Sequence, residues 1–159
     1  MLLLKRQDLK QIADQAESVY PLEACGLLAG FERADGDFEV TRLAPSKNMA
    51  EPGQNDRFEI DPELRLRLMR EVRAAAPAAL PGAGHSIIGH YHSHPDGTAR
   101  PSPTDLSMAW EPDLVWLITA VTDGQAVQSA AHLLSAGGTR FNNIGLDCLP
   151  RDEEYDKKL

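Results

Sequence analysis

The most constraining feature of this chain is a run of alternating histidines, His90, His92 and His94, that ends at Pro95. Side chains two residues apart on a β-strand point to the same face of the sheet. The run is strand-like up to Pro95, and proline is poorly tolerated in the interior of a strand. A strand over residues 87–94 therefore allows the imidazole rings of His92 and His94 to reach one point in space.

A second motif follows the histidines after a turn-rich stretch over residues 96–101. Ser102, Pro103 and Asp105 have the pattern of a helix start, with serine as the N-cap, proline at the first position and an acidic third residue. If the chain reverses between the two motifs, Asp105 folds back on the histidine pair. Two histidines and one carboxylate with an open fourth position suit a catalytic zinc site. The alternative is that Asp105 only completes a capping box with Ser102.

The rest of the chain interleaves helix-like and strand-like segments, which indicates an α/β or α+β class with a central sheet. Apolar residues at helical spacing predict one helix over residues 9–19, closed by Pro21. A second helix is predicted to begin at Pro62, with Asp61 as its N-cap. Strands are expected over residues 2–4, 24–31, 38–43, 87–94, 114–122 and 126–135.

The chain has 159 residues, which is the length of one domain, and we expect this domain to span residues 1–150. Residues 151–159 are mostly charged and predict a flexible tail. Within the domain, residues 44–57 lack any periodicity and predict a loop. Residues 74–84 are rich in alanine, proline and glycine and predict a linker.

Composition excludes several classes of function. The formal net charge of −8 argues against a nucleic-acid partner, because phosphate binding needs a basic surface. The two cysteines form no disulfide framework. No signal peptide is apparent, and no apolar window approaches the roughly 18 to 20 residues of a membrane helix. We therefore expect a cytoplasmic protein that does not act on membranes, whose oligomeric state the sequence does not indicate.

Together these motifs resemble the signature of the JAMM (MPN-plus, prokaryotic JAB-like) metallopeptidases. The signature is carried by His92-Ser93-His94-Pro95 and, six residues later, by Ser102-Pro103-Thr104-Asp105. Residues 20–28 are similar to the segment that carries the catalytic glutamate of this family, and residues 58–62 resemble bacterial members. The resemblance covers roughly residues 5–135. It implies a single-domain MPN/JAB fold, cytidine-deaminase-like, with a curved and mostly antiparallel central sheet flanked by helices.

The resemblance also implies a role for five residues. His92, His94 and Asp105 match the ligands of one zinc ion per chain. Glu23 matches the residue that holds the metal-bound water, acts as general base and then as acid toward the leaving amine. Without the resemblance, Glu23 would be interpreted as an exposed charge at a helix end. Ser102 matches the hydroxyl that stabilises the tetrahedral oxyanion.

The implied function is that of a zinc metallopeptidase acting on ubiquitin-like or sulfur-carrier proteins. Such an enzyme hydrolyses a peptide or isopeptide bond after the C-terminal tail of its substrate. The tail could lie as an added strand beside the sheet, under the loop of residues 44–57. The alternative is a non-cleaving MPN-type zinc protein that binds a ubiquitin-like partner as an interaction scaffold. Scaffold relatives look degraded at the metal ligands, whereas this sequence keeps all five functional positions.

Two other classes of zinc enzyme are excluded by the sequence. The histidine run also has a likeness to the His-x-His-x-Asp-His motif of metallo-β-lactamases, but Gly97 stands where the last histidine should be. Zinc deaminases need a Cys-x-x-Cys pair, which this sequence lacks.

A few further side chains carry separate expectations. Cys25 would share the face of Glu23 on a strand, where it is either a small apolar core residue or a group close to the metal. His90 is interpreted as a core residue or as a neighbour of the ligands rather than as a ligand. Trp110 and Trp116 are expected in the core.

Overall fold

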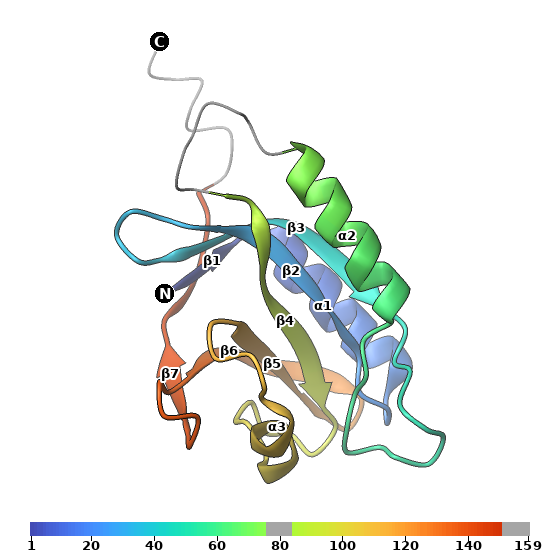
Figure 1. Ribbon diagram of the computed structural model, residues 1–159. Coiled ribbons are helices and arrows are strands. Elements are labelled where there is room, and N and C mark those ends of the chain that lie inside the picture. Colours follow the sequence, from blue (N-terminus) through green and yellow to red (C-terminus); the bar gives the residue numbers. More distant parts are fainter. Residues whose placement is uncertain (76–83, 151–159) are drawn as a thin grey trace.

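The computed structural model describes residues 1–75 and 84–150, and a curved mixed sheet forms its centre (Figure 1). In the described residues the sheet has eight strands in the spatial order β7-β6-β5-β4-β2-β3-β1-β8. Their bounds are Leu2–Leu4 (β1), Cys25–Glu32 (β2), Phe38–Ser46 (β3), Ser86–His94 (β4), Val115–Thr122 (β5), Gln125–Leu134 (β6), Phe141–Ile144 (β7) and Leu146–Cys148 (β8). Strand β4 is parallel to β5, and β1 is parallel to β3 and β8. The other neighbours are antiparallel, as predicted for most of the sheet.

Helices cover both faces of this sheet. In the described part of the chain they are α1 (Arg6–Val19), α2 (Pro62–Ala75) and the short α3 (Pro103–Met108). Helices α1 and α2 lie on opposite faces of the sheet, and α3 lies near the carboxyl end of β4 (Figure 1). The Asp61 carboxylate accepts a hydrogen bond of 2.9 Å from the Glu63 amide, which confirms the predicted start of α2. No helix in residues 1–75 and 84–150 is long and apolar enough to cross a membrane.

Alternation along the central strands sends neighbouring side chains into two separate cores. Leu28 of β2 and Tyr91 of β4 belong to the core under α1, together with Ile12 of that helix. Leu27 belongs to the core under α2, where it packs with Leu68. The histidines of β4 alternate with Tyr91, so they point to the face of the sheet that carries α2 and α3.

All the predicted strands and both long helices are confirmed, with shifts of a few residues at their ends. The loop predicted over residues 44–57 is wrong at its beginning, because β3 continues into it while paired with β2. Strands β7 and β8 were not predicted, since both are short edge strands without a fully buried side chain. The linker predicted over residues 74–84 begins inside α2. Its residues 76–83 and the predicted tail over residues 151–159 lie outside the described residues.

The prediction for one of the two tryptophans is wrong. Trp116 of β5 is buried as expected, but Trp110 is 86% exposed. Trp110 follows the end of α3, in a segment that leads through Glu111 and Asp113 to β5. A position outside a helix or strand has no periodic face, so its burial does not follow from the apolar character of the side chain.

The close approach of β4 to β5 generates a stability prediction at Gly89. A Cβ atom at this position would lie 2.3 Å from the carbonyl oxygen of Val115 on β5. We expect Gly89→Ala to lower the free energy of unfolding by about 1–3 kcal/mol, because the two backbones must move apart. In Gly137→Ala, the matched control, the nearest atom to the new Cβ is 3.9 Å away, and the change should stay within about 0.5 kcal/mol. Urea unfolding compares the two variants, and equal stabilities would contradict the close approach.

Candidate metal centre

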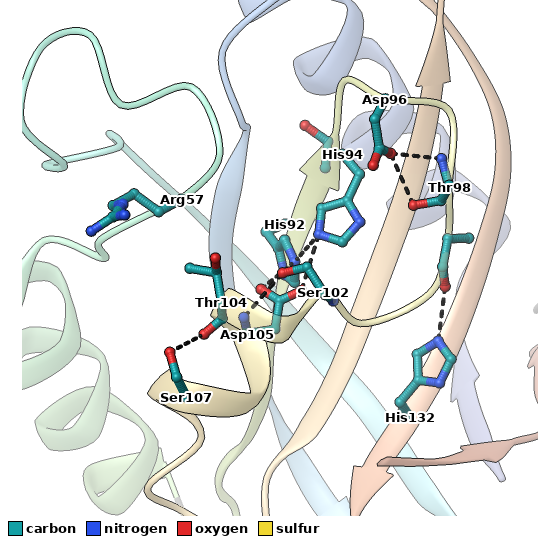
Figure 2. A network of polar contacts seen from close by, with 12 residues as sticks. Arg57, His92, His94, Asp96, Thr98, Ser102, Thr104, Asp105, Ser107 and His132 are labelled. Carbon is teal, nitrogen blue, oxygen red and sulfur yellow. Dashed lines mark hydrogen bonds and ion pairs between the residues drawn. The ribbon is translucent and has the colours of Figure 1, made fainter. Parts of the chain in front are cut away.

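The side chains of His92 and His94 lie at the carboxyl end of β4 and point toward Asp105 of α3 (Figure 2). All three are buried. Strand β4 is held on both sides, because His92 is paired with Cys25 of β2 and with Ile118 of β5. The sheet and α3 thus bring together the three residues that the sequence indicated as metal ligands.

The nitrogen and oxygen atoms of these side chains converge. His92 Nε2 lies 2.9 Å from His94 Nε2. Asp105 Oδ1 lies 3.2 Å from His92 Nε2, and Asp105 Oδ2 lies 3.1 Å from His94 Nε2. In a tetrahedral zinc site with bonds of about 2.0–2.1 Å, neighbouring ligand atoms are roughly 3.3 Å apart. The donor atoms and their spacing therefore fit a zinc ion, and the group could hold a metal.

Asp105 takes part in a helix cap as well as in this group. The Asp105 amide donates a hydrogen bond of 3.0 Å to Ser102 Oγ, and the Ser102 amide donates one of 2.6 Å to Asp105 Oδ2. This is the predicted capping box at the start of α3. The two interpretations of Asp105 are compatible, because the cap fixes the carboxylate while its oxygens face the histidines.

Aromatic packing holds the His92 ring in place. Phe58, which precedes α2, stacks on this ring with centroids 4.4 Å apart and planes at 19°. Trp116 meets the ring edge-on, at 5.8 Å and 87°. The Nδ1 atoms of His92 and His94 are buried and have no hydrogen-bond partner among the described residues. We infer that the orientation of His92 depends on Phe58 and Trp116 rather than on a polar contact of its second nitrogen.

Cys25 lies in the same aromatic cluster and outside the ligand group. Its side chain is fully buried and packs with Phe58 and Trp116. Burial raises the pKa of the Cys25 thiol to about 12, so the thiol stays protonated at neutral pH. These surroundings favour the interpretation of Cys25 as a small apolar core residue.

Glu23 lies in the short segment between α1 and β2, and it is only 4% exposed. Burial raises the pKa of Glu23 to about 8, while the charges of His94 and Asp105 shift it in opposite directions. Glu23 is therefore within electrostatic range of the ligand group. Its Oε2 atom is buried and has no hydrogen-bond partner among the described residues. A carboxyl group in such surroundings can exchange a proton near neutral pH.

The protonation states of His92 and Asp105 suit a cation, because a metal binds a neutral imidazole and an ionised carboxylate. Burial lowers the pKa of His92 and keeps its ring neutral. Burial acts to lower the pKa of His94, but the hydrogen bond and the charge of Asp105 raise it overall. Burial acts to raise the pKa of Asp105, but its hydrogen bonds with the two histidines hold that pKa well below its usual range. The carboxylate is therefore ionised at neutral pH, which is the form that binds metals.

Two other histidines support the site without joining it. His90 shares the face of His92, as predicted, and its ring meets Trp116 edge-on at 4.1 Å and 71°. His132 of β6 is buried, and its Nε2 lies 2.9 Å from the carbonyl oxygen of Ala99 (Figure 2). This contact ties the segment between β4 and α3 to the sheet.

Phe58 and Asn48 lie beside the candidate site and were not predicted to take part in it. Both belong to the irregular segment between β3 and α2, where no periodicity assigns a side chain to a face. The one available signal for Phe58 was the similarity of residues 58–62 to bacterial JAMM proteins. Nothing in the sequence distinguished Asn48 from a surface loop residue.

Solved structures share this architecture. A protein from Desulfitobacterium hafniense superposes with a TM-score of 0.76 at 27% identity, over 98% of this chain and 97% of the other. A JAB1/MPN domain protein from Archaeoglobus fulgidus superposes with a TM-score of 0.51 at 18% identity, over 94% of this chain and 98% of the other. The second likeness shows the fold alone.

Relatives of known activity are also similar in sequence. A desampylase from Haloferax volcanii is 38% identical over 100 residues, which are 62% of this chain and 62% of the desampylase. A CysO-cysteine peptidase from Mycobacterium tuberculosis is 27% identical over 123 residues, which are 77% of this chain and 75% of the peptidase. The match to the desampylase thus spans less than two thirds of that protein.

One family description covers most of the chain. The family of prokaryotic homologs of the JAB domain matches residues 5–132. This range includes the ligand group on β4 and α3, the segment before β2 and the loop that carries Phe58. The chain therefore belongs to the prokaryotic homologs of the JAB domain.

Proposed function

We propose that this chain is a zinc metallopeptidase that hydrolyses a peptide or isopeptide bond after the C-terminal tail of a ubiquitin-like or sulfur-carrier protein. The observation that carries the proposal is the convergence of His92, His94 and Asp105 within electrostatic range of the buried Glu23 carboxyl group. The names of the desampylase and the CysO-cysteine peptidase support hydrolysis at ubiquitin-like or sulfur-carrier proteins as the reaction.

His92 Nε2, His94 Nε2 and an oxygen of Asp105 would hold one zinc ion. When bound, zinc supplies a Lewis acid that polarises the scissile carbonyl and lowers the pKa of a water molecule to about 7. The three side chains leave one position of a tetrahedron open. The histidines are kept in position by pairing and packing of β4, and Asp105 by the cap of α3.

Glu23 acts in this proposal as the group that moves protons. Its carboxylate takes a proton from the attacking water and gives a proton to the departing amine. The burial of the group and the free Oε2 atom suit this task, since Oε2 has no competing hydrogen bond in the described residues. A base with a pKa near the working pH can both accept and return a proton.

Ser102 stabilises the negative charge that develops on the substrate oxygen. Its Oγ accepts a hydrogen bond from the Asp105 amide, which uses one acceptor position of the hydroxyl. The hydroxyl hydrogen remains available for donation. The cap thus fixes the oxygen and leaves the donor free to point at the substrate.

A ubiquitin-like tail would reach this site as an extended chain. Strand β4 is paired with β2 on one side and β5 on the other, so the tail cannot add to β4 itself. Main-chain partners for the tail must come from the segments that flank the site, residues 47–61 and 95–102. The substrate tail would therefore add as an extended strand beside the loop before α2.

The first test concerns the metal. We expect about one zinc per chain, as a single mononuclear site requires. His94→Ala and Asp105→Asn should each weaken zinc binding by more than about 10²-fold, since loss of an outer partner alone costs 10- to 100-fold. His85→Ala is the control, because the His85 ring packs at a tilt against Phe31, with centroids 5.1 Å apart, and His85 precedes β4 at the end opposite the ligand group. Elemental analysis and a competitive chelator measure the affinity, and a wild-type protein that never takes up supplied zinc would contradict the proposal.

The second test separates cleavage from binding. The substrate is a ubiquitin-like carrier with a short peptide after its Gly-Gly end. We expect Glu23→Gln to retain zinc and to lower kcat by about 10²- to 10⁴-fold, because it removes the proton carrier. Glu32→Gln, at the exposed far end of β2, is the control and should cleave normally. If wild type holds zinc and binds the carrier but never cuts it, the non-cleaving scaffold is the correct function.

The third test concerns Ser102. We expect Ser102→Ala to lower kcat by about 10²- to 10³-fold, which is typical for loss of one oxyanion donor. The same change should lower the free energy of unfolding by only about 1 kcal/mol, the usual contribution of an N-cap. Ser102→Thr keeps both the cap and the hydroxyl and should retain most of the activity. A loss of activity in Ser102→Ala no larger than that in Ser102→Thr would rule out the catalytic role.

A further inference from the structure

We propose that Asn48 is a positioning residue that fixes the orientation of Glu23 through the main chain. This inference rests on the proposed function, because it matters for catalysis only if Glu23 carries protons. Asn48 lies just beyond the end of β3, in the segment that leads to α2, and its side chain is partly buried. The whole β2–β3 hairpin lies between Asn48 and Glu23 in sequence, yet the two residues are in direct contact.

The Asn48 side chain uses all of its hydrogen-bonding capacity. Its Nδ2 donates to the carbonyl oxygens of Glu23 and Arg57, both at 3.1 Å. Its Oδ1 accepts from the amides of Ala50 and Glu59, both at 3.0 Å. These partners determine which end of the amide is the nitrogen, because a flipped amide would face two carbonyls with its oxygen and two N–H groups with its nitrogen.

The hydrogen bond from Asn48 completes a clamp on one peptide unit. The carbonyl oxygen of Glu23 and the amide of Ala24 belong to the same planar group. Asn48 Nδ2 holds the oxygen, and Ser93 Oγ accepts a hydrogen bond of 2.8 Å from the Ala24 amide. With both edges held, rotation of this plane is restricted, and with it the direction of the Glu23 side chain from its Cα.

Asn48 also closes the loop between β3 and α2 at its neck, which we define as the place where residues 46–50 and 57–61 meet. The Met49 amide donates a hydrogen bond of 2.8 Å to the carbonyl oxygen of Glu59, and Asn48 forms a β-bridge with Ile60. Phe58, which stacks on His92, lies within this neck. A single side chain therefore connects the main chain of the proposed base with the loop that packs on a proposed zinc ligand.

Few other side chains can replace asparagine here. Aspartate keeps an oxygen for the amides of Ala50 and Glu59 but presents a second oxygen to the carbonyls of Glu23 and Arg57. It therefore preserves one half of the contacts and breaks the half that reaches Glu23. Alanine removes both halves.

The test compares Asn48→Asp with a matched control in the same neck. We expect Asn48→Asp to lower kcat by about 10²-fold with KM and zinc content unchanged, because misplacing a catalytic group by about 1 Å can cost that much. Ser46→Ala is the control, since Ser46 Oγ accepts a hydrogen bond of 3.0 Å from the Asp61 amide and has no contact with the Glu23 peptide in the described residues. Its kcat should stay close to that of wild type. A wild-type kcat in Asn48→Asp, or an equal loss in Ser46→Ala, would overturn the inference.

A double variant distinguishes positioning from a general loss of structure. In the Glu23→Gln background, Asn48→Asp should cause no further loss of kcat, because there is no longer a base to orient. A purely structural role would instead lower the residual rate again. Additive losses would therefore contradict the inference while leaving the role of Glu23 intact.

Nuclear magnetic resonance gives a readout that does not depend on activity. The side-chain NH₂ protons of Asn48 in wild type should exchange with solvent more slowly than those of the exposed Asn142, and equal exchange would overturn the inference even if the variants failed to fold. The carbonyl carbon shift of Glu23 should change in Asn48→Asp and not in Ser46→Ala. If wild type never cleaves the carrier, the proposed function fails, while these measurements still decide whether Asn48 holds the Glu23 peptide.

Discussion

The double pairing of β4 sets the position of nearly every group in the candidate site. Antiparallel pairing with β2 places His92 opposite Cys25, just beyond Glu23, and parallel pairing with β5 puts Trp116 beside the histidines. If the pairing of β4 with β2 or with β5 shifted by one residue, the histidine side chains would point into the core under α1, and Tyr91 would point into the candidate site. Gly89 permits this arrangement, since any side chain there would collide with the β5 backbone.

The site gathers polar groups that are costly to bury, and this cost is itself informative. The Asp105 carboxylate is buried with two imidazoles and no lysine or arginine among its ion-pair partners in the described residues. An uncompensated ion in a protein interior costs several kcal/mol. Hydrogen bonds from the histidines and from the Ser102 amide offset part of this cost. A cation at the convergence point would offset more of it, which is why this arrangement favours a metal centre over a purely structural cluster.

Much of this architecture could be predicted from short-range patterns in the sequence. The features that could not be predicted depend on contacts between residues far apart in the sequence. The alternating histidines, the cap at Ser102 and the start of α2 are short-range patterns, and the structure has all three. The exposure of Trp110 and the edge strands β7 and β8 have no such pattern. The burial of Glu23 could be expected only from family resemblance, because a charge after a helix end is ordinarily exposed. The stacking of Phe58 on His92 joins residues from different elements, which no periodicity reveals.

The candidate ligands are held by interactions that do not require an ion. Pairing of β4 holds the histidine backbones, Phe58 and Trp116 hold the His92 ring, and the capping box holds Asp105. Zinc fingers differ, because there the metal supplies the folding energy itself. In a prearranged site, less of the binding energy of the metal is used to order its ligands. The same reasoning applies to Glu23, whose peptide is clamped by Asn48 and Ser93 before any substrate arrives. If Glu23 carries protons as proposed, a group fixed in this way needs little reorganisation during the reaction, and such preorganisation is the main physical means by which hydrolytic sites lower their barriers.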